Sequence, residues 1–184
     1  MGKDAHRAGR LMLASALNVV FDWISAQLHA LSSMDLAFAL GALLLIRASS
    51  RLGMWAYALV ALPGTLAHEL AHFLVALLLG AQPSFPSLVP QRSAHGWRLG
   101  SVAFRAGPLR SVPIALAPFA LAPLALWWAA HFLPGAGWPG YGVHAWVVGA
   151  LLSACLPSSA DFKIAIPALL VLAAIAALAW FVLH

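Results

Sequence analysis

Long apolar runs, separated by short polar or Pro/Gly-containing segments, dominate the hydrophobic pattern of the chain. A helix of about 20 apolar residues is long enough to cross the hydrocarbon core of a bilayer. The pattern predicts such spans over residues 53–80, 111–133, 143–160 and 164–183. Within the first of these, Pro63-Gly64 predicts an internal kink or a restart of the helix. A shorter apolar run at 36–46 crosses only if flanking residues extend the helix and its charged neighbours snorkel outward.

The first apolar segment, residues 11–30, differs from the others because it carries polar side chains on one face. These recur at spacings of three and four: Ser15, Asn18, Asp22, Ser25 and His29. Such a helix is either amphipathic, lying in the membrane surface, or spanning, with its polar stripe against protein. A packing helix is the simpler interpretation, and a contact with a regulatory membrane partner is the alternative.

Residues 81–110 interrupt the apolar pattern with an arginine-rich segment. Short β-type pieces at 85–89 and 99–104 predict a hairpin, with the polar residues 91–93 at its tip. Four arginines lie in this segment: Arg92, Arg98, Arg105 and Arg110. Cationic loops tend to stay on the cytoplasmic side, so we expect this loop to face the cytoplasm.

Composition supports a membrane protein. Of the 184 residues, 63% are hydrophobic and only 8% are charged, whereas a soluble domain has about a quarter charged. The net charge of +5 is spread between apolar runs, which indicates orientation signals and excludes a nucleic-acid partner. We therefore expect residues 1–184 to form a single all-α polytopic membrane domain in the lipid bilayer. It would have about five to six helices and a reentrant β-hairpin after the helix over 53–80.

One short motif, His68-Glu69-Leu70-Ala71-His72, carries the chemistry. Histidines four apart lie one helical turn apart, so both can bind one Zn²⁺ ion, and Glu69 can take a proton from a metal-bound water. Glu69 is the chain's sole glutamate and lies within a predicted span, where an ionisable residue costs about 3 kcal/mol. Bound zinc would compensate that cost. The alternative is a set of satisfied polar residues that pack helices together.

A catalytic zinc site takes three protein ligands and keeps one position open. The choices for the third ligand are Asp161, His95, His131 and His144. The expected depth in the membrane favours Asp161 as the third ligand. At 1.5 Å per residue the histidine motif lies about 22 to 28 Å along its span and Asp161 about 27 Å along the span that begins at 143. His131 and His144 lie near the opposite face, and His95, in the arginine-rich loop, remains an alternative.

The stretch at 63–72 (PGTLAHELAH), with Ala160-Asp161 far downstream, resembles the intramembrane zinc metalloproteases of the site-two protease type. The resemblance extends over residues 55–166 in the order of elements, although only the histidine motif is specific. It implies that His68, His72 and Asp161 bind zinc and that Glu69 is the catalytic base. It also implies a multi-pass protein of a cell membrane, here a bacterial inner membrane.

The chain departs from that family in two respects. Family members usually have glycine after the aspartate, whereas Asp161 precedes Phe162 in a Pro-Ser-x-x-Asp sequence that resembles smaller relatives. The segment 134–142 is also too short to hold an inserted PDZ-like domain.

The implied activity is hydrolysis of peptide bonds in a membrane protein or peptide substrate. A membrane helix must unwind before its peptide bonds are accessible, and the edge of a hairpin can hold the unwound strand by main-chain pairing. The residues expected to do so are Leu99, Gly100, Ser101 and Val102. The alternative function is a non-proteolytic zinc-binding membrane protein, either a transporter or a scaffold subunit.

Overall fold

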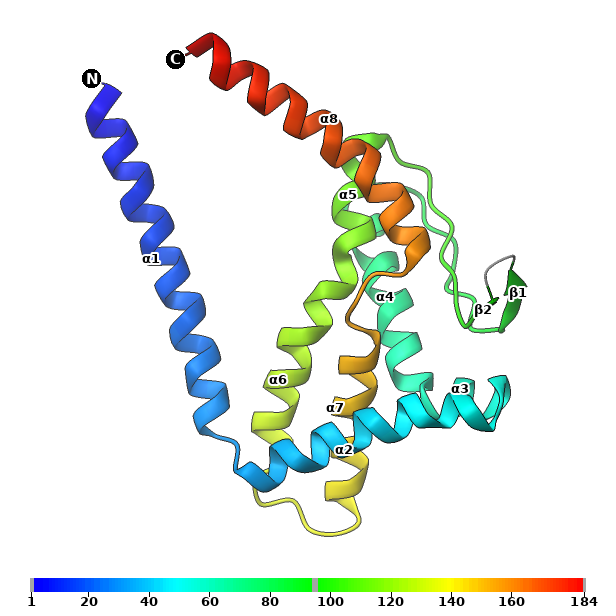
Figure 1. Ribbon diagram of the computed structural model, residues 1–184. Coiled ribbons are helices and arrows are strands. Elements are labelled where there is room, and N and C mark those ends of the chain that lie inside the picture. The colour runs from blue at the N-terminus through cyan, green and yellow to red at the C-terminus, as the bar shows by residue number, and fades with distance from the viewer. Residues whose placement is uncertain (1, 94–95, 184) are drawn as a thin grey trace.

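The computed structural model describes residues 2–93 and 96–183, which are mostly helical (Figure 1). The α-helices are α1 (Gly2–His29), α2 (Ser33–Ser49), α3 (Met54–Val60), α4 (Leu62–Leu78), α5 (Pro108–Leu116), α6 (Leu121–Phe132), α7 (Gly140–Ala154) and α8 (Ser159–Leu183). Two 3₁₀ turns, Ser50–Leu52 and Ala117–Ala120, follow α2 and α5. The strands are β1 (Gln91–Ser93) and β2 (Gly96–Arg98).

Four helical segments of the described chain are long and apolar enough to cross a membrane: Leu11–His29, Ser33–Leu52, Pro108–Phe132 and Ser159–Phe181. A fifth is present if α3 and α4 together make one span. The coarse fold prediction is thus confirmed, because the chain is mostly helical with several span-length apolar helices, as in a multi-pass membrane protein. The orientation of the arginine-rich loop stays a prediction.

The kink or restart predicted at Pro63-Gly64 within residues 53–80 is confirmed, because the structure divides this segment into α3 and α4. The axes of α3 and α4 differ by 71°, and Pro63 lies in the first turn of α4. Proline is favoured in a first helical turn because its missing N–H has no helical partner there, so Pro63 marks a restart of the helix. The histidine motif consequently belongs to α4 alone.

The boundary predicted at residue 160 is also wrong. Helix α7 ends at Ala154, and α8 already begins at Ser159. Pro157 lies between them, and a proline removes a helical hydrogen bond and disfavours continuation of the preceding helix. Asp161 therefore lies in the first turn of α8 and not beyond the end of the preceding helix.

Helices α5 and α6 follow one another along one line (Figure 1). Helix α5 packs against α4 and α8, α6 packs against α7, and α7 also packs against α4 and is crossed by α2. Two glycines allow close backbone approach at these crossings. A Cβ on Gly149 would lie 2.7 Å from the Leu43 nitrogen of α2, and a Cβ on Gly64 of α4 would overlap the Ala150 carbonyl of α7. Small residues at crossings are typical of helix packing in membranes. Gly64 thereby brings the motif helix against the end of α7.

The predicted hairpin after α4 is present (Figure 1). Its arms pair at several levels, with β1 antiparallel to β2 and a bridge between Ser87 and Ser101. The predicted tip is wrong, because residues 91–93 form strand β1 itself. Near the base of the hairpin, the Arg105 N–H donates to the Ala81 carbonyl at 2.8 Å. The hairpin thus returns the chain to α5 beside the end of α4.

Candidate metal centre

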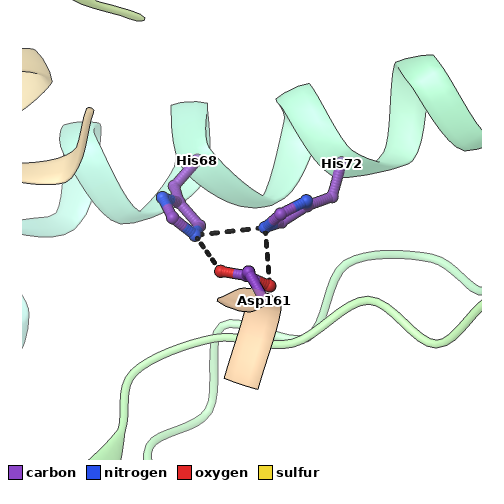
Figure 2. A group of neighbouring side chains, drawn as sticks. All are labelled: His68, His72 and Asp161. Carbon is purple, nitrogen blue, oxygen red and sulfur yellow. Dashed lines mark hydrogen bonds and ion pairs between the residues drawn. The ribbon is translucent and has the colours of Figure 1, made fainter. Parts of the chain in front are cut away.

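The histidines of α4 and the aspartate of α8 meet at one point (Figure 2). His68 Nε2 and His72 Nε2 are 3.2 Å apart. The Asp161 carboxylate lies 3.5 Å from His68 Nε2 through Oδ2 and 3.3 Å from His72 Nε2 through Oδ1. The structure therefore brings together the three residues that the sequence singled out as metal ligands.

Both imidazole rings are fixed by backbone carbonyls on their other side. His68 Nδ1 lies 2.8 Å from the Ala154 carbonyl at the end of α7, and His72 Nδ1 lies 2.7 Å from the Ile114 carbonyl of α5. A ring nitrogen that faces a carbonyl oxygen carries the proton, so in the neutral rings both Nε2 atoms keep a free lone pair. This carbonyl contact is the usual support of a metal-binding histidine.

The three groups fit a divalent metal. Zinc binds imidazole nitrogen and carboxylate oxygen at about 2.0–2.2 Å, so neighbouring ligand atoms of a tetrahedral site are about 3.3 Å apart. The donor atoms here are separated by 3.2–3.5 Å. Two lone pairs and a carboxylate facing one another at these distances repel unless a metal cation or a proton lies between them. Two imidazoles and one carboxylate also form one of the known ligand sets of catalytic zinc.

Asp161 is oriented by the start of its own helix. The Ser158 N–H donates to Asp161 Oδ2 at 2.6 Å, and the Asp161 N–H donates to Ser158 Oγ at 3.3 Å. These reciprocal bonds form a capping box, with Ser158 at the N-cap and Asp161 three residues later. The Pro-Ser-x-x-Asp sequence is therefore a helix-start signal. It could have identified Ser158 as the residue that orients Asp161.

Glu69 lies between α4 and the returning arm of the hairpin. Its side chain is buried, and a Cβ on Gly100 would lie 2.7 Å from both Glu69 Cγ and Oε1. Only a glycine at position 100 leaves room for this carboxylate. Among the described residues, none donates a hydrogen bond to Glu69 within bonding distance, so the carboxylate is free to take a proton.

A cavity of about 650 Å³ lies over the group of His68, His72 and Asp161. Its walls include the two histidines, Glu69 and Asp161, and also the four residues predicted to hold substrate, Leu99, Gly100, Ser101 and Val102. Sequence reasoning missed Tyr57, Thr65 and Lys163 as lining residues, and it considered Arg98 only as an orientation signal. No local pattern could have found them, because they come from four separate segments of the chain.

The other predicted ligands lie elsewhere. His131 Nδ1 faces the Trp127 carbonyl of its own helix at 2.8 Å, and His144 Nδ1 accepts a hydrogen bond from Trp128 Nε1 at 3.3 Å. Neither belongs to the group of three, and His95 is outside the described residues.

The one cysteine, Cys155, follows α7. Burial raises the pKa of its thiol, which donates a hydrogen bond to the Leu152 carbonyl at 3.2 Å. We therefore assign Cys155 a structural role, because its neutral thiol already donates a hydrogen bond to the backbone.

Comparison of the chain with protein-family models, with curated protein sequences and with solved structures finds no match. The resemblance to site-two type proteases therefore rests on the motif residues, and the function has to be argued from the site itself.

Proposed function

We propose that this protein is a zinc-dependent intramembrane endopeptidase that hydrolyses peptide bonds of membrane-embedded substrates. One observation carries the proposal. Two imidazole lone pairs and one carboxylate converge at tetrahedral spacing, beside an unpartnered glutamate and under an open cavity. A purely structural metal site has no need of the glutamate or of the cavity.

In this proposal His68, His72 and Asp161 hold the zinc, and the Ala154 and Ile114 carbonyls keep the two rings in the metal-binding tautomer. Zinc bound there would polarise the scissile carbonyl and lower the pKa of a water molecule to about 7. The Glu69 carboxylate would accept a proton from the attacking water and deliver it to the nitrogen of the leaving amine.

The hairpin supports binding of an extended substrate. Ser101 exchanges both main-chain hydrogen bonds with Ser87, each at 2.9 Å, so its backbone faces the partner arm. Along a strand the backbone groups of alternate residues face opposite edges. Gly100 and Val102 therefore offer their N–H and C=O groups to the other edge, and within the described chain no backbone group pairs with them. An unwound substrate segment can add there as a strand.

The test is cleavage by the purified full-length protein, reconstituted in lipid vesicles, of a library of transmembrane peptides analysed by mass spectrometry. We expect defined cleavage products that disappear on treatment with the zinc chelator 1,10-phenanthroline and return when Zn²⁺ is restored. Stoichiometric zinc with no cleavage of any peptide would indicate the non-proteolytic zinc-binding alternative.

The contact between Gly100 and Glu69 gives a sharper prediction. In the Gly100→Ala variant the new methyl group would displace the Glu69 side chain, whose far end is flexible enough to move without unfolding the protein. Misplacing a catalytic group by about 1 Å costs on the order of 100-fold in rate. We expect kcat for peptide cleavage to fall by about that factor, with zinc content unchanged.

The matched control for this variant is Gly107→Ala, because a Cβ at Gly107 would meet nothing within 4 Å. It should cleave at the wild-type rate. Equal cleavage rates for Gly100→Ala and the wild type would contradict the proposal that Glu69 is the general base.

A further inference from the structure

Two cationic side chains at the cavity have no acidic partner. Arg98, the last residue of β2, and Lys163, in the first turns of α8, both line the cavity and are exposed. In the described part of the chain the carboxylate–cation pairs are those of Asp161 with the two histidines. Arg98 and Lys163 thus stand at the site with their charges unpaired.

The protein has few acids that could neutralise them. The structure describes four acidic side chains, and two of these, Glu69 and Asp161, already lie in the cavity. Asp35 is committed elsewhere, because its carboxylate accepts hydrogen bonds from the Tyr141 hydroxyl and from Ser32, both at 2.7 Å. The fourth, Asp22, is exposed on α1. Within the described chain no acid forms a salt bridge with Arg98 or Lys163, although Glu69 lies near enough to Arg98 to attract its charge.

A metal ion bound by His68, His72 and Asp161 would add further positive charge to the cavity. The charge of the Glu69 carboxylate offsets part of the Arg98 charge. A divalent cation at the three ligands would balance the two carboxylates of the cavity, Glu69 and Asp161. The two cations would then remain uncompensated around a cavity with low-dielectric walls, which concentrates their field on whatever enters it.

We propose that Arg98 and Lys163 are specificity determinants that select peptide substrates with an aspartate or glutamate side chain close to the scissile bond. This inference rests on the proposed function. Arg98 directly precedes the segment 99–102 that would pair with the substrate, so an acidic side chain on the paired strand comes within its reach. Lys163 lies two residues after the proposed ligand Asp161, where α8 lines the cavity. It would contact a part of the bound peptide that Arg98 does not reach.

The other cations of the hairpin distinguish this role from general attraction to the membrane surface. Arg92 and Arg105 belong to the same arginine-rich segment, yet neither lines the cavity. If the only purpose of these charges were to contact anionic lipid headgroups, their effects would not depend on whether the side chain faces the metal centre. Because both Arg98 and Lys163 line the cavity, a peptide carboxylate bound inside it is the ligand that fits both of them.

The test measures binding, so it does not depend on catalysis. All proteins carry the Glu69→Gln change, are loaded with zinc and are reconstituted in uncharged phosphatidylcholine vesicles. Fluorescence anisotropy then compares labelled transmembrane peptides that differ only in Asp or Asn, or Glu or Gln, at positions flanking one central peptide bond. The cavity variants are Arg98→Gln and Lys163→Gln, and the matched control is Arg92→Gln on the same hairpin.

We expect acidic peptides to bind about tenfold more tightly than their amide counterparts. Each cavity variant should lose about threefold of that preference, which is the size of a single partly exposed ion pair, and 0.5 M salt should weaken the preference. Arg92→Gln should keep the full preference. Equal binding of acidic and amide peptides, or equal losses in all three variants, would overturn the inference.

A competition experiment with anionic lipid distinguishes a peptide-binding role of the two cations from a lipid-binding role. Phosphatidylglycerol vesicles should leave the preference for acidic peptides intact. Displacement of the peptides by phosphatidylglycerol in an Arg98-dependent manner would instead assign both cations to lipid headgroups and contradict the inference. Failure of the proposed hydrolase function is visible separately, as zinc-loaded wild-type protein that binds these peptides and leaves them intact.

Discussion

The Glu69→Gln variant should lose peptide cleavage almost completely while it retains its zinc. Glutamine has nearly the same shape as glutamate, but its amide cannot accept a proton from water. Removal of a positioned general base typically costs 10²- to 10⁴-fold in rate, so we expect a loss of about that size in kcat. The three ligand side chains are untouched. Cleavage rate and zinc content should be measured on the same preparation.

The control for Glu69→Gln is Asp22→Asn, the same acid-to-amide change on the exposed helix α1. It should leave both cleavage and zinc content unchanged. Full cleavage by Glu69→Gln would show that this carboxylate is not the base. A loss of zinc in this variant would instead show that Glu69 acts as a ligand.

The Asp161→Ala variant should lose zinc. Loss of a supporting residue around a metal ligand already costs 10- to 100-fold in affinity, so loss of the ligand itself should cost at least about 100-fold. The two imidazoles that remain would leave zinc one protein ligand short of a catalytic site. The measurement is competition for Zn²⁺ with a fluorescent chelator, alongside zinc content after dialysis.

Asp22→Ala serves as the matched control here, because it removes the same functional group from a helix remote in sequence from the site, and it should bind zinc like the wild type. Retention of stoichiometric zinc at wild-type affinity by Asp161→Ala would exclude Asp161 as a ligand and leave the third position to another residue.

The sequence alone predicted the mostly helical fold and several apolar segments, because span-length hydrophobic runs depend only on local composition. It also marked the 71° bend between α3 and α4, because Pro63-Gly64 predicted a kink or a restart there. It failed at the boundary between the last two helices. The start of α8 at Ser159 depends on a capping box, whose hydrogen bonds were visible in the sequence only as a Ser-x-x-Asp pattern.

Some residues of the candidate site could likewise be predicted from the sequence, and others could not. His68, Glu69 and His72 follow from local periodicity, since one turn of helix brings the two histidines together. Asp161 was reached by an argument from depth in the membrane, although the structure assigns it to a different helix. The Ala154 and Ile114 carbonyls and the contact of Gly100 with Glu69 could not be predicted, because they depend on how distant segments pack.

The central claim is that His68, His72 and Asp161 together bind one zinc ion. X-ray absorption at the zinc edge, combined with elemental analysis of the purified wild-type protein, tests it most directly. We predict one zinc per chain, bound by two imidazole nitrogens and by oxygen at about 2.0–2.2 Å, and lost in the His68→Ala/His72→Ala variant. Sulfur coordination by Cys155, or a zinc signal that the double variant leaves unchanged, would contradict the claim.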